Sequence, residues 1–70
     1  MRVDIPEFKK EMAIHNYKSI TALAEASGVN RNTISDMLNG RVFPSADVMC
    51  RLKETFGWSG ETAGRIFFAP

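Results

Sequence analysis

The stretch from Ile20 to Asn39 constrains the fold of this chain more than any other part of its sequence. It holds two short runs with helical periodicity, separated by a single break at Ser27-Gly28-Val29. Glycine adopts a positive φ without steric cost, so it suits a tight turn between helices. Apolar residues recur at helical spacing on both sides of the break: Ile20, Leu23, Ala24, Val29, Ile34, Met37 and Leu38. The spacing predicts two short helices that share one apolar interface across the turn.

The length and composition of the chain are those of a small globular domain. It has 70 residues, of which 44% are hydrophobic and 24% charged, and we expect a single domain over residues 1–70. Cys50 is the one cysteine, so neither an intramolecular disulfide nor a Cys/His metal cluster is expected, and the implied compartment is a reducing cytoplasm. No apolar run is long enough for a signal peptide or a membrane span. We therefore expect no membrane partner and no cofactor.

The charge balance gives little support to a nucleic-acid partner. Nine Lys and Arg oppose eight Asp and Glu, which leaves a net charge of +1, whereas strongly basic composition is the usual sign of a DNA-binding protein. Residues 30 to 51 carry three basic and two acidic side chains, and the segments before and after them are balanced. The small excess falls on the second helix of the pair and on the segment that follows it.

Capping signals and apolar periodicity together predict five helices and no strand. The expected helices span residues 5–15, 20–27, 31–38, 46–56 and 60–67, each within a residue or two at its ends. Their predicted N-caps are Asp4, Ser19, Asn30, Ser45 and Ser59, whose side chains can accept a hydrogen bond from the first helical turn. No stretch alternates with period two over the length of a strand. The predicted fold class is all-α.

A pair of helices joined by a short glycine-containing turn is the helix-turn-helix pattern, whose second helix can enter the major groove of DNA. The sequence also resembles one family with this motif, the Cro/CI-type or XRE-like regulators of temperate phages and bacteria. The resemblance covers roughly residues 5–68. It rests on Leu23-Ala24, Gly28-Val29, Ile34-Ser35, Gly40 and Pro44-Ser45, and the Phe67-Phe68 tail is similar to that of short phage members. It implies a five-helix lambda-repressor-like domain that acts as a transcriptional regulator, a Cro-like repressor in a phage or prophage genetic switch.

The sequence departs from this family at two positions. Members often carry Gln at the first position of the first motif helix, where its amide touches the DNA backbone, but this chain has Ile20. The second departure is Asp36, an acid on the face expected to meet phosphates. Its carboxylate can accept a hydrogen bond from a cytosine amino group, and it can equally face a basic protein partner.

The helix predicted over 31–38 has an apolar back and a front of hydrogen-bonding groups. Arg pairs with guanine and Asn with adenine through two hydrogen bonds each, so Arg31 and Asn32 are the strongest candidates for reading bases. Arg41, just beyond the helix, suits a phosphate. The residues predicted to contact a double-stranded DNA operator are Asn30, Arg31, Asn32, Thr33, Ser35, Asp36, Asn39 and Arg41. The same face also fits a solvated helix surface in which Asn30 acts only as a cap.

An enzyme is not expected, because no motif supplies a catalytic pair. His15 has no Cys, Ser or Asp partner at a meaningful spacing and reads as a helix-end residue. Cys50 lies beside the apolar stripe of its helix and is expected to be an inert, partly buried thiol.

Two protein partners are compatible with the sequence. Neighbouring helical residues diverge by about 100°, so Phe67 and Phe68 do not both pack on one core, and we expect a homodimer contact through Ile66, Phe67 and Phe68. The alternative to a DNA-binding regulator is a phage antirepressor or modulator that uses the same scaffold to bind a repressor protein. The near-neutral charge, Asp36 and the missing Gln motivate it.

Overall fold

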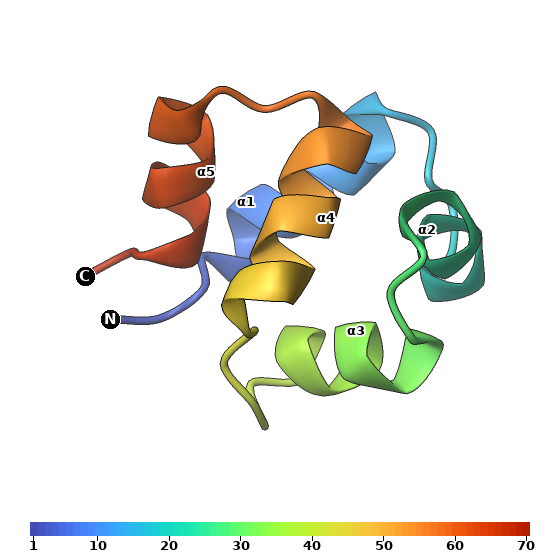
Figure 1. Ribbon diagram of the computed structural model, residues 1–70, viewed down its shortest axis with the longest axis horizontal. Coiled ribbons are helices and arrows are strands. Elements are labelled where there is room, and N and C mark those ends of the chain that lie inside the picture. Colours follow the sequence, from blue (N-terminus) through green and yellow to red (C-terminus); the bar gives the residue numbers. More distant parts are fainter.

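A computed structural model describes all 70 residues, which form five α-helices (Figure 1). They are α1 (Ile5–Ile14), α2 (Ile20–Ser27), α3 (Arg31–Leu38), α4 (Ala46–Phe56) and α5 (Gly60–Phe67). The lambda-repressor-like fold predicted from the sequence is confirmed, and four helices have the predicted bounds. The first helix ends one residue early, because His15 takes the C-cap position and Asn16 follows with a left-handed φ of 62°.

Each helix begins at its predicted N-cap. The side chains of Asp4, Ser19, Asn30, Ser45 and Ser59 each accept a hydrogen bond from a backbone N–H of the first turn, at 2.8 to 3.3 Å. A cap of this kind typically contributes ~1 kcal/mol. Three of the helices have only eight residues and are marginal without such support. The caps therefore help to fix where these helices begin.

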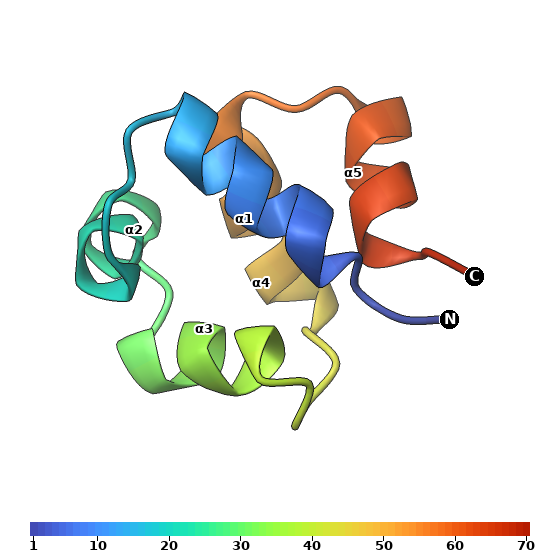
Figure 2. The same ribbon diagram turned by 180° about the vertical axis from the view of Figure 1, so that it is seen from behind.

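The core is a single cluster of 14 buried residues with Phe8 of α1 at its aromatic centre. The Phe8 ring lies 5.5 Å from Phe56, 5.7 Å from Trp58 and 6.4 Å from Phe67, measured between centroids. Trp58 stacks on Phe56 at 4.4 Å. Figure 2 shows the arrangement of the helices: α1 lies across α4, with α5 on one side and the α2–α3 pair on the other. The aromatic residues therefore join α1, α4 and α5 into the support on which α2 and α3 rest.

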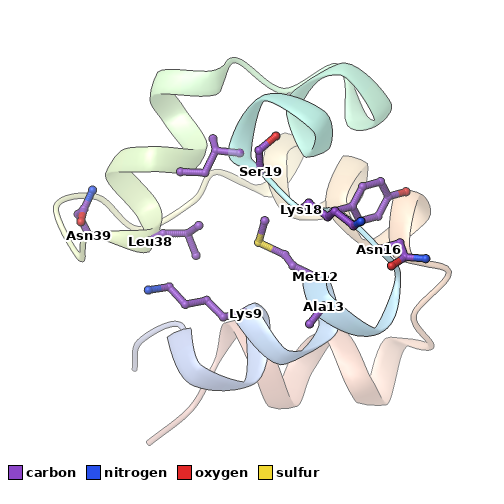
Figure 3. Close-up of a pocket in the computed structure, with 10 residues that line it drawn as sticks. Lys9, Met12, Ala13, Asn16, Lys18, Ser19, Leu38 and Asn39 are labelled. Carbon is purple, nitrogen blue, oxygen red and sulfur yellow. The ribbon is translucent and has the colours of Figure 1, made fainter.

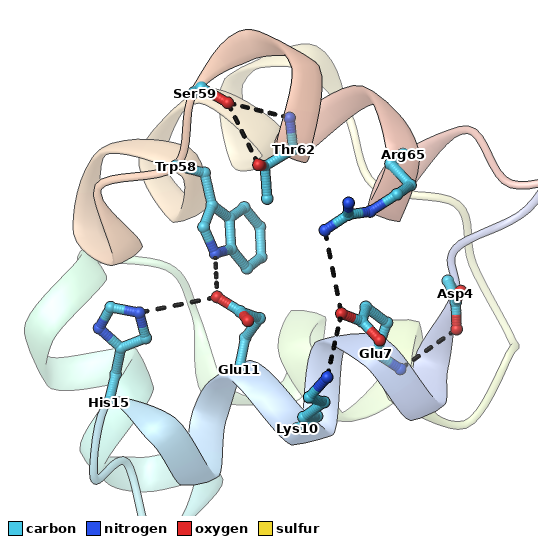
Figure 4. A network of polar contacts seen from close by, with 9 residues as sticks. All are labelled: Asp4, Glu7, Lys10, Glu11, His15, Trp58, Ser59, Thr62 and Arg65. Carbon is cyan, nitrogen blue, oxygen red and sulfur yellow. Dashed lines mark hydrogen bonds and ion pairs between the residues drawn. The ribbon is translucent and has the colours of Figure 1, made fainter.

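A polar network ties α1 to the segment around α5 (Figure 4). The Trp58 indole N–H donates to Glu11 Oε1 at 2.8 Å, and His15 Nε2 lies 3.7 Å from the same oxygen. One turn earlier, Glu7 Oε1 lies 3.9 Å from Arg65 Nη2. The hydrogen bond from Trp58 to Glu11 contributes most to stability, because ion pairs at the surface contribute only ~0 to 1 kcal/mol each.

The two ends of the chain lie side by side (Figure 1). Arg2 and Ala69 form one isolated antiparallel bridge, with N–H···O distances of 3.0 and 2.8 Å. The neighbouring Phe67 is buried and Phe68 is 46% exposed, which confirms that the two rings diverge. None of the helices is long and apolar enough to cross a membrane.

One prediction about the core was wrong. Cys50 is exposed, not partly buried. It lies one position past Met49, and the step of about 100° per residue carries its side chain off the apolar stripe of α4.

Candidate nucleic-acid interface

The turn between α2 and α3 fixes the direction of the second motif helix. Gly28 has φ 75° and ψ 7°, and its N–H donates to the Ala24 carbonyl at 2.9 Å. Ser27 Oγ accepts from the Val29 N–H at 3.2 Å and donates to the Leu23 carbonyl at 2.8 Å. Because Val29 is itself 5% exposed, the turn is anchored to the core immediately before α3 begins.

Helix α3 packs on the core through its apolar back and leaves its polar side accessible. Ile34, Met37 and Leu38 are all buried. The side chains that face away from the core recur at helical spacing and are those of Asn32, Ser35, Asp36 and Asn39, with Arg31 at the N-terminal end of the helix. We call these five residues the reading face. Thr33, also predicted as a contact, lies at the flank of this face and is half-buried, as are Ser35 and Asp36.

A small hollow lies where the first turn of α2 meets the entering end of α3. It is lined by Ile20, Thr21, Arg31, Asn32 and Ser35. Thr21 is exposed, and the sequence reasoning missed it as a candidate contact. Its position in the first turn of the helix that precedes the reading helix was the available signal. Ile20 is half-buried and forms the apolar wall of the hollow.

The acid and the base predicted as separate contacts lie together. Gly40 has φ 72° and turns the chain back, so that the Arg41 N–H donates to the Asp36 carbonyl at 2.8 Å. The Arg41 Nη1 then lies 3.3 Å from Asp36 Oδ1, with side chains that are 70% and 41% exposed. The carboxylate on the reading face is therefore compensated from within the chain, and Arg41 is not a free cation.

Two of the predicted asparagines already serve their own helix. Asn30 Oδ1 accepts from the Asn32 N–H at 2.8 Å, as an N-cap does. At the other end, Asn39 Nδ2 donates to the Ser35 carbonyl at 2.9 Å and lies 3.4 Å from Ser35 Oγ. By contrast, the side chains of Arg31 and Asn32 are exposed and make no hydrogen bond or ion pair within the chain. These two are the side chains most available to an external partner.

No metal-binding or catalytic cluster of side chains accompanies this surface. No three His, Cys, Asp or Glu side chains converge where a metal ion could bind. His15 packs edge-on against Phe56 at a centroid distance of 5.3 Å, which is a packing role.

Comparison with known proteins gives one match. A family model described as a helix-turn-helix domain matches residues 10–65. This range includes all of α2, α3 and α4 and every residue predicted to contact DNA. No curated protein and no solved structure matches the chain.

Proposed function

Because the chain belongs to the helix-turn-helix domain family, whose members are typically non-enzymatic DNA-binding regulators, we propose that it is a sequence-specific transcriptional regulator of Cro/CI type. The observation that carries this proposal is the state of Arg31 and Asn32. Both stand exposed and unpaired at the entering end of a helix whose other side is buried in the core. We further propose a role in a phage or prophage genetic switch, as a repressor in the cytoplasm, on the strength of the Cro-like sequence pattern.

In the proposed complex α3 lies in the major groove with its N-terminal end toward the bases. Arg31 donates two hydrogen bonds to guanine O6 and N7, whereas the Asn32 amide accepts one from adenine N6 and donates one to adenine N7. Each pairing is worth ~1–3 kcal/mol of discrimination against the wrong base. Asp36 can accept from a cytosine amino group, and Arg41 at 3.3 Å lowers the repulsion between this carboxylate and nearby phosphates.

A homodimer on a two-fold operator completes the proposal. A single module of this size buries ~600–1,000 Å² on DNA, which is small for specific binding, so pairing two half-sites one helical turn apart is the favoured arrangement. Ile66 and Phe67 belong to the core, so of the three residues predicted for the dimer only Phe68 is accessible. Phe68 lies 6.0 Å from the Phe43 ring, and Val42 beside it is also exposed. We extend the proposed dimer contact to these residues.

The test begins with selection of preferred duplexes from a random-sequence pool. Binding of wild type and Arg31→Ala is then measured by fluorescence anisotropy on the selected site and on its single-base variants. We expect Arg31→Ala to lose roughly 5- to 150-fold of preference at one guanine, the equivalent of ~1–3 kcal/mol, while preferences elsewhere remain. Failure to select any duplex, or an unchanged preference in the variant, would reject the proposal.

A second candidate function is an antirepressor that binds a repressor protein. The exposed Phe43 and Phe68 rings favour it, because the core of a protein–protein interface is apolar and enriched in aromatic residues. Gel shifts separate the two functions. An antirepressor gives no shift alone and abolishes the shift of the repressor encoded by a neighbouring gene.

A further inference from the structure

A groove of about 600 Å³ lies between α1 and the two motif helices (Figure 3). Its floor is apolar and includes Met12 and Leu38. Lys9 approaches from α1, and Lys18 lies on the loop before α2. The ten lining residues include these two lysines and no Asp or Glu. The lining of the groove therefore carries two positive charges and no negative charge, in a chain whose net charge is only +1.

The groove continues the reading face. Ile20 lines both the groove and the hollow beside Arg31. Asn39, on the groove side of α3, donates its hydrogen bond to Ser35, which lines the hollow. With α3 in the major groove as proposed, a DNA strand that runs along the reading face would pass over the opening of the groove.

Most Lys and Arg side chains that have no carboxylate partner line the groove or the hollow beside Arg31. Four of the nine basic side chains, those of Lys10, Arg41, Arg51 and Arg65, lie within 4 Å of a carboxylate. The five that do not are Arg2, Lys9, Lys18, Arg31 and Lys53. Three of these five line the groove or the hollow, whereas no acidic side chain lines either. Most of the unpaired cations therefore lie beside the reading face, where Arg41 is paired with Asp36.

We propose that Lys9 and Lys18 bind phosphates of the DNA strand that passes over this groove, a contact that rests on the proposed function. An ammonium group on a four-carbon stem suits a phosphate, which needs a mobile point charge more than a fixed geometry. No acid in the groove competes for the two lysines. Contacts of this type position the protein on the duplex and carry no base information. The two lysines would thus supply phosphate contacts beside α3.

The double variant Lys9→Gln/Lys18→Gln tests the proposal. The measurement is the affinity of the selected duplex from 50 to 200 mM salt. Each neutralised phosphate adds about 0.9 to the slope of log K against log salt, so losing two should flatten the slope by about 1.8. Over this fourfold range the wild-type affinity should therefore fall by a factor about 12 larger than that of the variant. The base preference should not change.

The matched control is Arg2→Gln/Lys53→Gln, which removes the same charge from two residues that are also unpaired and that line neither the groove nor the hollow. Its slope should stay close to that of the wild type. Melting curves check that each variant is folded. An unchanged slope in the Lys9/Lys18 variant, an equal flattening in the control, or an altered base preference would each overturn the lysine assignment while leaving the DNA-binding function in place. A wild-type protein that binds no duplex would remove both proposals.

Discussion

Replacing Asp36 by Asn tests whether the pair with Arg41 restrains binding to DNA. The carboxylate lies on the reading face, and its oxygen is 3.3 Å from the Arg41 guanidinium. Since the two side chains are 41% and 70% exposed, the pair contributes ~0 to 1 kcal/mol to stability, and the variant should fold normally. Asn is nearly isosteric with Asp, so the substitution changes the charge and leaves the shape of the face.

The size of the effect follows from the freed guanidinium. If Arg41 gains one phosphate contact, the slope of log K against log salt steepens by about 0.9, and at 0.15 M salt the affinity for random-sequence duplex rises about fivefold. Discrimination between bases should decrease in Asp36→Asn if the Asp36 carboxylate accepts a hydrogen bond from cytosine, with a loss of ~1–3 kcal/mol at one base pair. Asp36→Asn is therefore expected to bind a random-sequence duplex more tightly and to discriminate less between bases at that one position.

Fluorescence anisotropy on a random duplex and on the selected duplex measures both quantities across a salt series. Arg41→Gln is the informative companion, because it leaves Asp36 uncompensated and should weaken binding to both duplexes. The double variant Asp36→Asn/Arg41→Gln should lose the gain seen in Asp36→Asn alone. A slope in Asp36→Asn that equals the wild-type slope would refute the reasoning, since it would mean that the pair does not hold Arg41 away from phosphate.

Two further predictions concern the scaffold. Gly28→Ala and Gly57→Ala should each lower the free energy of unfolding by ~1–2 kcal/mol in urea titrations, because both glycines have φ above 70°. Gly28→Ala should be only slightly more destabilising than Gly57→Ala, since its Cβ would meet the flexible end of Arg51 at 3.3 Å while a Cβ at Gly57 has open space. A loss several times larger for Gly28→Ala would contradict this reasoning. Trp58→Phe removes the donor to Glu11 and should lower the free energy of unfolding by ~1.5–3 kcal/mol, whereas Glu11→Gln, which keeps an acceptor oxygen, should lose less. Equal unfolding midpoints for Trp58→Phe and the wild type would show that this bond carries no stability.

The sequence predicted the five helices well because each of them begins at a side chain that can cap it. Ser19 and Asn30 could be assigned from residue type alone, and the structure gives both the predicted hydrogen bonds. Trp58 was missed because it follows the C-cap Gly57 and lies outside any helical period, so nothing in the pattern marks its side chain as buried.

The interface was harder to predict than the fold, because its electrostatics depend on how the chain folds back. The spacing from Asp36 to Arg41 is five residues, which does not bring side chains together on a continuous helix. The pair forms only because Gly40 takes a positive φ and returns the chain toward α3. Lys9 and Lys18 lie far from α3 in the sequence, and only the packing of α1 beside the motif helices brings them to one groove.

These pairings also explain why a net charge of +1 is a poor guide to the partner of this protein. The molecule measures 28 × 24 × 21 Å, whereas the Debye length at physiological salt is about 8 Å. Charges on opposite faces are therefore screened from one another, and a phosphate responds mainly to the side chains nearest to it. Near α3 these are Arg31, Lys9 and Lys18, none of which is paired, together with one carboxylate that Arg41 compensates. A chain that is balanced as a whole can thus present a locally positive face, and the salt dependence of binding, more than its isoelectric point, reports that face.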